Sequence, residues 1–534
     1  MPVPATLAEQ KFLWAQVGAE RRGVCAAMNR SLRKLAVFAI AGLSAGAAGA
    51  RAQQSASITE DSAKPTIVAA PAASVPHVFA FAVSTKSADA RRLVEVALDQ
   101  YENVLLDRSE QSARQATEKD PDFALAYAVW SFASRRTQPN VQALHKAEAL
   151  VSKASADEQL LVKFLTSVQK SDMLPAIVSM NELLARFPKD THALYLTSEW
   201  LYFQQDYDRS VRMMEQIIKI DPNFAPAFNM LGYAKVETGD PDATKALAYL
   251  KRYVELQPGQ PNPEDSLGEV SRYAGDDKGS LEHYSAALKI TPNFITSQIG
   301  LGDTYTLMGK FENARAEYHK AWLMANNDRD RMHIEFQKAM VNFWEGNKTA
   351  GLQALAELDE KAQVLKDPYS VFEVQETRAL LAAEPGEKIE RLQAMEKIYS
   401  VPVPGMIGAD RNTSLAAVLR DEARIHAELQ QLQAADAAIT KLELLAAKSR
   451  DLIVGNCFES AKGYVFFARH DFQSAEDQLS ADPHSPLAIK RLATAREMTG
   501  DGMGAESAQL RLKYLRAPTP EWYLATHPDK VSAK

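Results

Sequence analysis

Apolar positions recur along most of this chain at the spacing of amphipathic helices. From about residue 88 onward, stretches of about 12–16 residues carry apolar side chains three or four positions apart, as one face of a helix requires. Short turns rich in Gly, Asp or Asn separate these stretches, and the alternation of β-branched residues that is typical of strands does not occur. The pattern predicts an all-α chain.

The predicted helices follow a repeat of about 34 residues, the length at which helix pairs stack into a solenoid. Prolines that close every second helix have spacings of 34, 36 and 34 residues, at Pro188, Pro222, Pro258 and Pro292. A Leu-Gly pair keeps the same register, at Leu231-Gly232, Leu267-Gly268 and Leu301-Gly302. The period therefore indicates stacked helix pairs and not a closed globule.

A small residue in each second helix stands four positions before a large one. These combinations are Ser210 with Met214, Ala246 with Leu250, Ser280 with Tyr284 and Ala314 with Tyr318. The glycines of the first helices allow the two helices of a pair to approach closely, and large side chains fill the seam between them. The register therefore predicts antiparallel helix pairs.

With these landmarks, residues 191–326 resemble four consecutive tetratricopeptide repeats, most clearly in LGDTYTLMGKFENARAEYHKA from Leu301 to Ala321. The pattern departs from the family at Thr197-Ser198 and at Asn326. The resemblance implies an α-solenoid, a right-handed superhelix of antiparallel helix pairs. The chain resembles exported bacterial proteins of this family. It also resembles the repeat blocks of bacterial receptor-like Ser/Thr kinases, although the kinase motifs HRD and DFG are missing here.

The repeat weakens on both sides of this block. Upstream, Pro121 stands almost two periods before Pro188, so we expect two degenerate repeats within residues 89–190. Downstream, residues 327–534 stay helical but lose the period, apart from a repeat-like unit from Gly463 to Pro483. They either continue the solenoid or form a separate helical cap. Because terminal repeats drift, we favour one solenoid of roughly six to ten helix pairs.

The N-terminal region has the order of a secretory signal peptide. Basic residues precede an apolar run from Leu35 to Leu43, and an A-x-A cleavage site follows at Ala50–Ala52. We expect translation to start at Met28, residues 1–52 to be removed, and residues 53–88, rich in Ser, Ala, Thr and Pro, to form a flexible linker. The alternative is a membrane anchor, but the strongly apolar run is about half as long as a spanning helix requires.

Charge and cysteine content narrow the choice of partners. Residues 1–52 hold seven of the 61 basic and two of the 68 acidic residues, so the mature chain would carry 54 against 66, a formal charge of −12. Such a surface argues against nucleic acid or anionic lipid as partner. Cys457 would be its one cysteine, which excludes an internal disulfide even in the periplasm or outside the cell, where we expect the protein to work.

In the family, the first helices of successive pairs line a concave groove that holds a peptide or a partner helix. Counted from the Leu-Gly register, the inward positions here are acidic and aromatic: Tyr195, Glu199, Tyr202, Asn229, Tyr233, Glu237, Asp265, Glu269, Tyr273 and Asp303. None is the Lys or Arg with which chaperone-binding members clamp a C-terminal carboxylate. Tyrosine beside carboxylate suits a basic or proline-containing segment. The alternative is a solvated acidic face whose tyrosines pack between repeats.

The sequence does not indicate a catalytic, cofactor or metal site. Its ten histidines are scattered without an HExxH helix or a nearby cysteine pair. His283 and His319 stand at equivalent heights on successive second helices, where interhelical packing is the better explanation. Cys457 beside Phe458 fits buried packing.

We therefore expect a non-catalytic scaffold that binds a protein or peptide in its concave groove, without cofactor or metal and without a transmembrane span. The alternative is an accessory or sensor protein that binds a small molecule or glycan through its C-terminal helices, which a deep apolar pocket there would favour. A helical hydrolase ranks last, because no constellation of isolated carboxylates is present. The sequence leaves the partner and the oligomeric state open.

Overall fold

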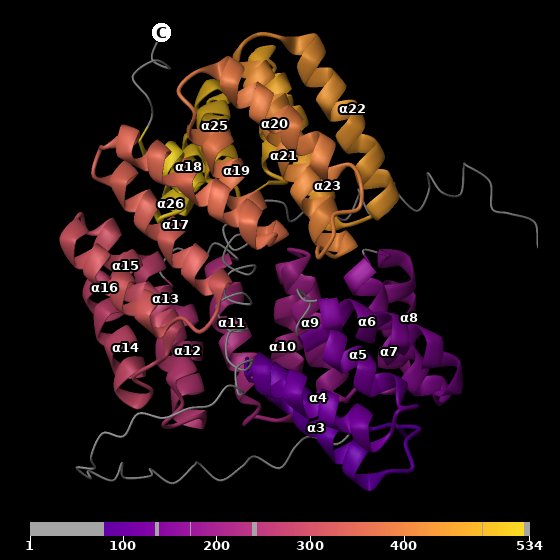
Figure 1. Cartoon of the computed structure of the whole chain (residues 1–534). Helices are drawn as coiled ribbons and strands as arrows, with labels where there is room; N and C mark the ends of the chain where they lie inside the picture. The colour runs from indigo at the N-terminus through magenta and orange to yellow at the C-terminus, as the bar shows by residue number, and fades with distance from the viewer. Residues whose placement is uncertain (1–78, 134–137, 171, 238–242, 483, 528–534) are drawn as a thin grey trace, which may run out of the picture.

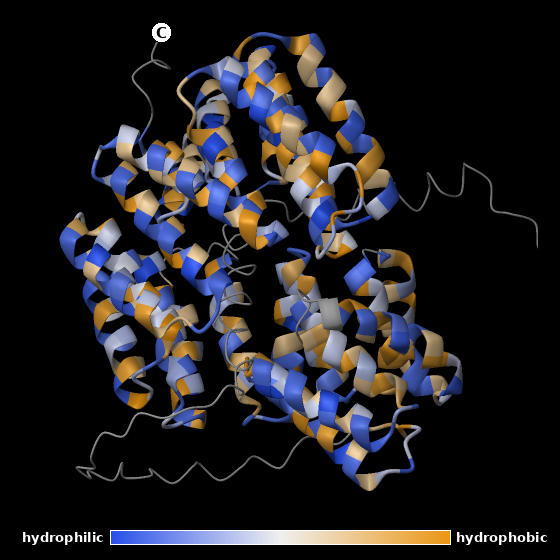
Figure 2. Cartoon of the chain, in the orientation of Figure 1, coloured by the Kyte–Doolittle hydropathy of each residue, from blue (hydrophilic) through white to orange (hydrophobic). Residues whose placement is uncertain are grey.

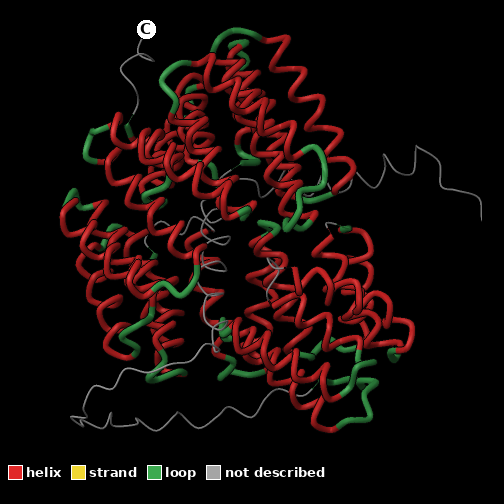
Figure 3. The backbone as a smooth tube through the Cα atoms, in the orientation of Figure 1, coloured by secondary structure: helices red, strands yellow, loops and turns green. Residues whose placement is uncertain are grey.

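The computed structural model describes residues 79–133, 138–170, 172–237, 243–482 and 484–527. Within these ranges the regular structure is entirely helical and no strand is present (Figure 3). The predicted all-α class is confirmed. The predicted signal peptide, residues 1–52, lies outside the described residues.

The helices are labelled in chain order from α3 to α27. The first twelve are α3 (Ala88–Glu102), α4 (Leu106–Lys119), α5 (Ala124–Ala133), α6 (Gln138–Leu150), α7 (Ala156–Lys170), α8 (Met173–Arg186), α9 (Thr191–Phe203), α10 (Tyr207–Ile220), α11 (Ala225–Glu237), α12 (Thr244–Leu256), α13 (Pro261–Ala274) and α14 (Asp277–Ile290). A 3-10 turn, η2 (Val151–Lys153), follows α6.

The remaining helices include the longest of the described chain. They are α15 (Ile295–Leu307), α16 (Phe311–Met324), α17 (Asp328–Trp344), α18 (Lys348–Leu365), α19 (Pro368–Leu381), α20 (Pro385–Tyr399), α21 (Gly408–Glu428), α22 (Leu432–Ser449), α23 (Leu452–Ala468), α24 (Phe472–Leu479), α25 (Pro486–Thr499), α26 (Gly502–Lys513) and α27 (Pro520–Thr526).

Helices α3 to α26 form twelve consecutive pairs, and each helix packs against the next one in the chain (Figure 1). The same packing of consecutive helices runs through the described part of the C-terminal third. Two expectations from the sequence were too low: three helix pairs, not two, precede Thr191, and the total exceeds ten. The additional upstream pair, α3 and α4, ends at Lys119, just before the proline from which the sequence repeat was counted.

The seam between the paired helices is built as the sequence register predicts. A Cβ atom on Gly232 would lie 2.5 Å from Leu250 Cγ, and one on Gly302 would lie 2.5 Å from Tyr318 Cε1. Leu250 and Tyr318 are fully buried. Each glycine is thus required by the close approach of a large side chain from the partner helix.

The sequence period is lost downstream because the helix pairs become longer. The first helices α9, α11, α13 and α15 begin at intervals of 34, 36 and 34 residues. The first helices α17, α19, α21 and α23 begin 40, 40 and 44 residues apart, and the interval to α25 is again 34. The architecture is preserved while the spacing changes, so a search for one fixed period fails there.

Packed structure begins before the first helix, within the predicted linker 53–88. Phe79, Phe81 and Val83 alternate as buried residues, and Ala80 N donates to Asp190 Oδ2 at 2.9 Å. The two phenylalanine rings pack at α8 and α9. The ring centroid of Phe81 lies 5.4 Å from that of Phe187, which caps α8, and the ring centroid of Phe79 lies 5.3 Å from that of His192 in α9. Residues 53–78 lie outside the described part of the chain.

The superhelix completes more than one turn, and its second turn rests on the first. The end of α7 contacts the start of α21, and the end of α9 contacts the start of α23, where Leu452 N donates to Gln204 Oε1 at 3.1 Å. Asn456 Nδ2 donates to Gln205 Oε1 at 2.9 Å. In both places the touching helices are seven pairs apart in the chain. Figure 1 shows the orange C-terminal helices above the violet N-terminal ones.

Apolar and polar residues are mixed along the helices (Figure 2), and the buried apolar ones form clusters between neighbouring helices. The inner helix α7 illustrates this, because Leu161, Val162, Phe164 and Leu165 are all fully buried although they point in different directions. A helix that packs on several sides is apolar nearly all round. Among the described helices, none combines the length and the apolar composition that a membrane span requires.

Candidate binding surface on the inner face of the superhelix

The ten predicted groove residues lie on the first helices α9, α11, α13 and α15, which neighbour one another through the superhelix. Most of them are buried, and only Tyr233, Asp265 and Glu269 keep partial exposure. The inner face is therefore acidic and aromatic, as its sequence suggests, but it is covered. The covering side chains come from the two ends of the same chain.

The N-terminal pair covers the part of the inner face on α9. Tyr101 Oη donates to Glu199 Oε2 at 2.8 Å, and Tyr195 Oη donates to the carbonyl oxygen of Glu102 at 3.3 Å. His192 Nδ1 lies 2.6 Å from Glu102 Oε1. Further along α9, the ring of Tyr202 packs edge-on against Tyr207, with 5.1 Å between their centroids.

A hydrogen-bonded ladder joins α11 to α13. Glu269 accepts from Tyr233 Oη at 2.8 Å and from Tyr273 Oη at 2.6 Å. Burial, followed by the nearby charge of Glu269, raises the pKa of both tyrosines well above its usual value. The phenols therefore remain protonated donors that hold the carboxylate in place.

One arginine that the sequence did not single out neutralises this face. Arg272 is 1% exposed, and its guanidinium lies between the carboxylates of Glu269 and Asp303. Asp303 also accepts from Tyr318 Oη at 2.7 Å. A buried cation with two carboxylate partners makes the face much less negative than its acidic residues alone suggest.

Glu237, at the end of α11, meets the C-terminal helices. It is 1% exposed, and its Oε2 lies 2.9 Å from Arg511 Nη2 and 3.3 Å from His484 Nδ1. Arg511 Nη1 also donates to the carbonyl oxygen of Val236 at 2.6 Å. Burial raises the pKa of Glu237 to about 7, although Arg511 acts in the opposite direction. This carboxylate thus joins the first superhelical turn to the second.

Two predicted groove residues have fewer partners. Asp265 accepts from Ser297 Oγ at 2.5 Å, and burial raises the pKa of its carboxyl to about 7. The side-chain oxygen of Asn229 is buried and has no hydrogen-bond partner among the described residues. The side chains of Asp265 and Asn229 can therefore form further hydrogen bonds on the inner face.

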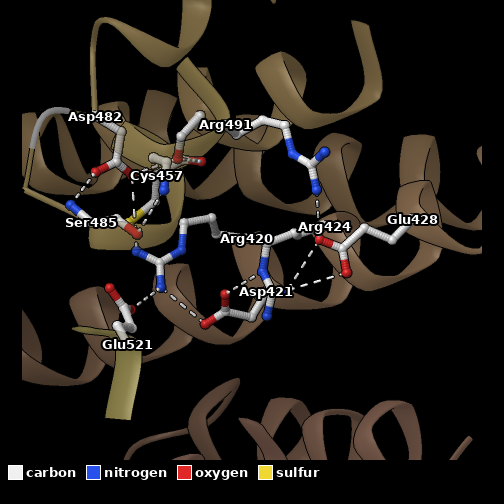
Figure 4. Close-up of polar contacts among 11 residues, drawn as sticks. Arg420, Asp421, Arg424, Glu428, Cys457, Asp482, Ser485, Arg491 and Glu521 are labelled. Atoms are coloured by element: carbon white, nitrogen blue, oxygen red, sulfur yellow. Dashed lines mark hydrogen bonds and ion pairs between the residues drawn. The ribbon is translucent and has the colours of Figure 1, made fainter. Parts of the chain in front are cut away.

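A second cluster of buried charges, centred on Arg420, lies on the inner side of α21 (Figure 4). Arg420 Nη2 lies 2.9 Å from Asp421 Oδ2 and 2.8 Å from Glu521 Oε1, and its Nη1 lies 3.9 Å from Asp482 Oδ2. Burial works against the charge of Arg420, but Asp421 and Glu521 raise the pKa of its guanidinium well above the usual value. Ser460 Oγ donates to Asp482 at 2.6 Å.

The C-terminal segment, residues 514–527, crosses the inner face between these clusters. Its residues 515–519 are not helical, and the seven-residue helix α27 follows. Arg516 Nη1 lies 2.9 Å from Asp277 Oδ1, and Glu521 pairs with Arg420. The segment is basic and proline-containing at its start, and its charged partners Asp277 and Arg420 lie outside the ten predicted groove residues.

A cavity of about 520 Å³ lies beside this segment, between the end of α13 and α26. Gln509, Lys513, Arg516 and Trp522 contribute to its lining. The wall combines cationic, amide and aromatic groups. Ala274 and Leu512 add apolar surface, so the cavity is mixed in character and not purely apolar.

Two residues named in the search for chemistry have structural partners. Cys457 is fully buried in α23. His283 Nδ1 lies 2.7 Å from Glu264 Oε2, in the packing between α13 and α14. Within the described ranges, no group of three His, Cys, Asp or Glu residues has the arrangement of a metal site.

The residues that the sequence analysis missed are cations. Arg272 and Arg511 pair with predicted groove residues, whereas Arg516 pairs with Asp277 and Arg420 with Glu521. The pairing of Arg272 could have been predicted from the sequence, because it stands three positions after Glu269 on the same helix face. The other three come from distant parts of the chain, and only the superhelical turn brings them to their partners.

No protein-family model and no curated protein matches this chain. Among solved structures, a tetratricopeptide repeat protein from Parabacteroides merdae ATCC 43184 is 13% identical with a TM-score of 0.33, over 53% of this chain and 98% of that one. PilW, a type IV pilus biogenesis factor, is 17% identical with a TM-score of 0.33, over 39% and 93%. A chain of the APC/C hetero-tetramer Cut9-Hcn1 is 15% identical with a TM-score of 0.37, over 80% and 76%.

Likenesses this weak add nothing to the assignment, which rests on the chain itself. The glycine seams, the helix pairs at intervals near 34 residues and the superhelical stacking define an α-solenoid protein of the tetratricopeptide-repeat type. Proteins built in this way use an extended concave surface for binding.

Proposed function

We propose that this protein is a non-catalytic scaffold that works outside the cytoplasm and binds a segment of a partner protein on the inner face of its superhelix. One observation carries the proposal: the inner face already holds an extended, proline-containing segment of the chain itself. Charge pairs of Arg516 and Glu521 fix this segment at both ends of its extended part. A surface with these contacts can accept a similar segment from another chain.

The location outside the cytoplasm is supported by the sequence. The order of basic residues, a short apolar run and an A-x-A site before Gln53 is that of a secretory signal. The test is fractionation of the source cells. We expect mature protein beginning near Gln53 in the periplasm or the medium, whereas full-length protein in the cytoplasm would contradict this part of the proposal.

The absence of catalysis is supported by how the inner charges are used. Glu269, Asp303 and Glu237 are hydrogen-bonded or paired with arginines, and none of the three stands alone in an open cleft. A catalytic acid or base needs access to a substrate as well as a shifted pKa. The buried contacts of these residues serve the packing of the superhelix.

The binding test compares partner capture by the mature protein, residues 53–534, with capture by two variants. The inner variant carries Tyr233→Phe and Asp265→Asn, which remove polar groups of partly exposed inner residues with little change in volume. The outer variant carries Lys278→Ala and Glu282→Gln, which remove an exposed ion pair on α14. We expect the inner variant alone to lose its partners while both stay folded. Equal retention would move the binding site away from the inner face.

The cavity beside Trp522 favours a second candidate function, an accessory protein that binds a small molecule. Its cations Lys513 and Arg516 would select an anionic ligand, such as an acidic sugar. Titration of the mature protein with acidic and neutral sugars, followed by tryptophan fluorescence, tests this candidate. Saturable quenching by an acidic sugar that Lys513→Ala weakens would support it, and an unchanged signal would exclude it for these ligands.

A further inference from the structure

We infer that the C-terminal segment, residues 514–527, is an intramolecular ligand of the inner face, and that the partner is a protein segment of the same chemistry that takes its place. The inference rests on the proposed binding function and adds the nature of the partner. The segment presents, in chain order, a cation, two prolines, a carboxylate and two aromatic rings, at Arg516, Pro518, Pro520, Glu521, Trp522 and Tyr523.

The apolar side chains of the segment enter three different hydrophobic clusters. Leu515 packs in the cluster of α21 to α26, and Ala517 packs in the cluster of α9 to α13. Tyr523 packs among residues of α17 to α19, where its ring lies 6.0 Å from that of Phe343. Trp522 lies 5.4 Å from Trp344, also between centroids. The segment thus touches separate parts of the superhelix as a bound peptide would.

The charges of the two side chains that anchor the segment, Arg420 and Asp277, stay paired or solvated when the segment leaves. Arg420 keeps the carboxylate of Asp421 at 2.9 Å and that of Asp482 at 3.9 Å if Glu521 is removed. Asp277, the partner of Arg516, has a side chain that is 26% exposed, so water can solvate it. Release therefore does not leave an isolated charge in the interior, which would be the main electrostatic obstacle.

Release also requires little rearrangement of the chain. The segment follows the last helix pair, α25 and α26, and all twelve pairs precede it. Its helix α27 has seven residues, fewer than the ~12–15 at which an isolated helix becomes stable in water. The segment can therefore open locally while the helix pairs stay folded.

The contacts define the partner as an extended protein segment. A cation two residues before the first proline would reach Asp277, and a carboxylate five residues after that cation would reach Arg420. Prolines limit the conformations of the free segment, so less entropy is lost on binding. Aromatic residues directly after the carboxylate would fill the site beside Trp344 and Phe343.

The experiment measures binding of a fluorescent peptide with the sequence of residues 514–527, YLRAPTPEWYLATH, to the mature full-length protein. The release variant carries Arg516→Glu and Glu521→Arg, which reverse both anchors of its own segment. We expect it to bind the peptide at least about ten-fold more tightly than the parent, whose site is occupied. A peptide with the same two charge reversals is expected to bind neither protein tightly.

A matched control variant carries Arg469→Glu, which reverses a cation in an exposed ion pair with Asp436. It is expected to bind the peptide as weakly as the parent. If the release variant gains no affinity although it stays folded, the inference is overturned. The same conclusion follows if the reversed-charge peptide binds as well as the native one.

Hydrogen exchange of the parent covers the case in which the release variant does not fold. Amides of Tyr523, Leu524 and Ala525 should exchange through local opening, at least about ten-fold faster than the most protected amides of α13. Exchange only through global unfolding would make the segment a permanent part of the core and overturn the inference. The proposed function would survive if partner capture still depended on the inner face but the peptide did not compete with it.

Discussion

Helices α9–α16 and α17–α24 each form four pairs of the same superhelix, but their interiors are stabilised differently. In the first block three of the four seams place a glycine against a large buried side chain, as Gly302 faces Tyr318, and Ser198 faces Met214 in the seam of α9 and α10. In the second block the longest helix, α21, carries Arg420 and Asp421 into the interior, where they form an ion cluster. Glycine seams occur in the second block as well, as Gly463 faces Leu479, and the first block has its own buried cation, Arg272. The blocks differ in reach, because the ion cluster of the second block includes Glu521 from the C-terminal segment.

The first block is recognisable in the sequence because its seam residues recur at nearly equal spacing, whereas the second block has longer and less regular pairs and an ion cluster that has no period. A steric seam needs a small and a large residue at fixed positions, and these positions repeat with the helix pair. An ion cluster needs partners that meet in space, and Arg420 meets Glu521 only because the chain has turned back on itself. The contrast leads to four predictions, of which the largest effect concerns this cluster.

Arg420→Ala should lower the free energy of unfolding by about 3–5 kcal/mol, because Asp421, Asp482 and Glu521 would remain buried beside a missing cation. Arg469→Ala, which removes an exposed cation paired with Asp436, should change it by less than about 1 kcal/mol. Urea unfolding of both variants measures the difference. Similar small effects would show that the cluster does not hold the second block together.

Gly302→Ala should destabilise the first block by about 1–3 kcal/mol, because the new Cβ would lie 2.5 Å from Tyr318 Cε1. The neighbouring helix pairs contact this seam from both sides, so strain should lower the cooperativity of unfolding as well. Thermal unfolding followed by circular dichroism provides the measurement. An unchanged transition would mean that the seam can widen without loss.

The pH dependence should follow the buried carboxyls of the inner face. Burial raises the pKa of Asp265 to about 7, so this group binds its proton more tightly in the folded chain than in the unfolded one. Its stabilising contribution is complete below about pH 4 and is lost as the pH rises to about 7. Asp265→Asn, which cannot ionise, should gain stability on the order of 1 kcal/mol at pH 8 and almost none at pH 4.

Urea unfolding at pH 4 and pH 8 tests whether Asp265→Asn gains stability only at the higher pH. Glu443→Gln, at an exposed position of α22, serves as the control and should show no such pH-dependent gain. A variant of Asp265 that is less stable than the parent at pH 8 would indicate that the ionised carboxylate is needed on the inner face.

Gly455→Ala should have the smallest effect and the opposite sign. Gly455 lies in α23, and no atom lies within 4 Å of the position that its Cβ would occupy. Alanine should stabilise the helix by up to about 1 kcal/mol, because glycine loses more backbone entropy on folding. Its thermal midpoint, compared with that of Gly302→Ala, separates helix propensity from the steric seam.

The sequence predicted the class of fold, because it follows from local periodicity, and it placed the ten groove candidates on the first helices of the pairs, where the structure has them. It did not predict that Glu199 meets Tyr101 or that Glu237 meets Arg511. These contacts depend on small rotations between successive pairs, which add up over three pairs in the first contact and seven in the second and are not encoded at any single position. The acidic groove was therefore expected to be open, whereas the structure covers it with both ends of the chain.

The central claim is that the second superhelical turn rests on the first, and cysteine cross-linking tests it directly. Gln205→Cys and Asn456→Cys place thiols on side chains that are hydrogen-bonded at 2.9 Å between α9 and α23. A short bismaleimide should join them within one dilute, folded chain, whereas the two single variants and the pair Gln205→Cys with Lys320→Cys should remain unlinked. Failure of the Gln205–Asn456 pair to cross-link in a folded chain would show an open solenoid and contradict the account.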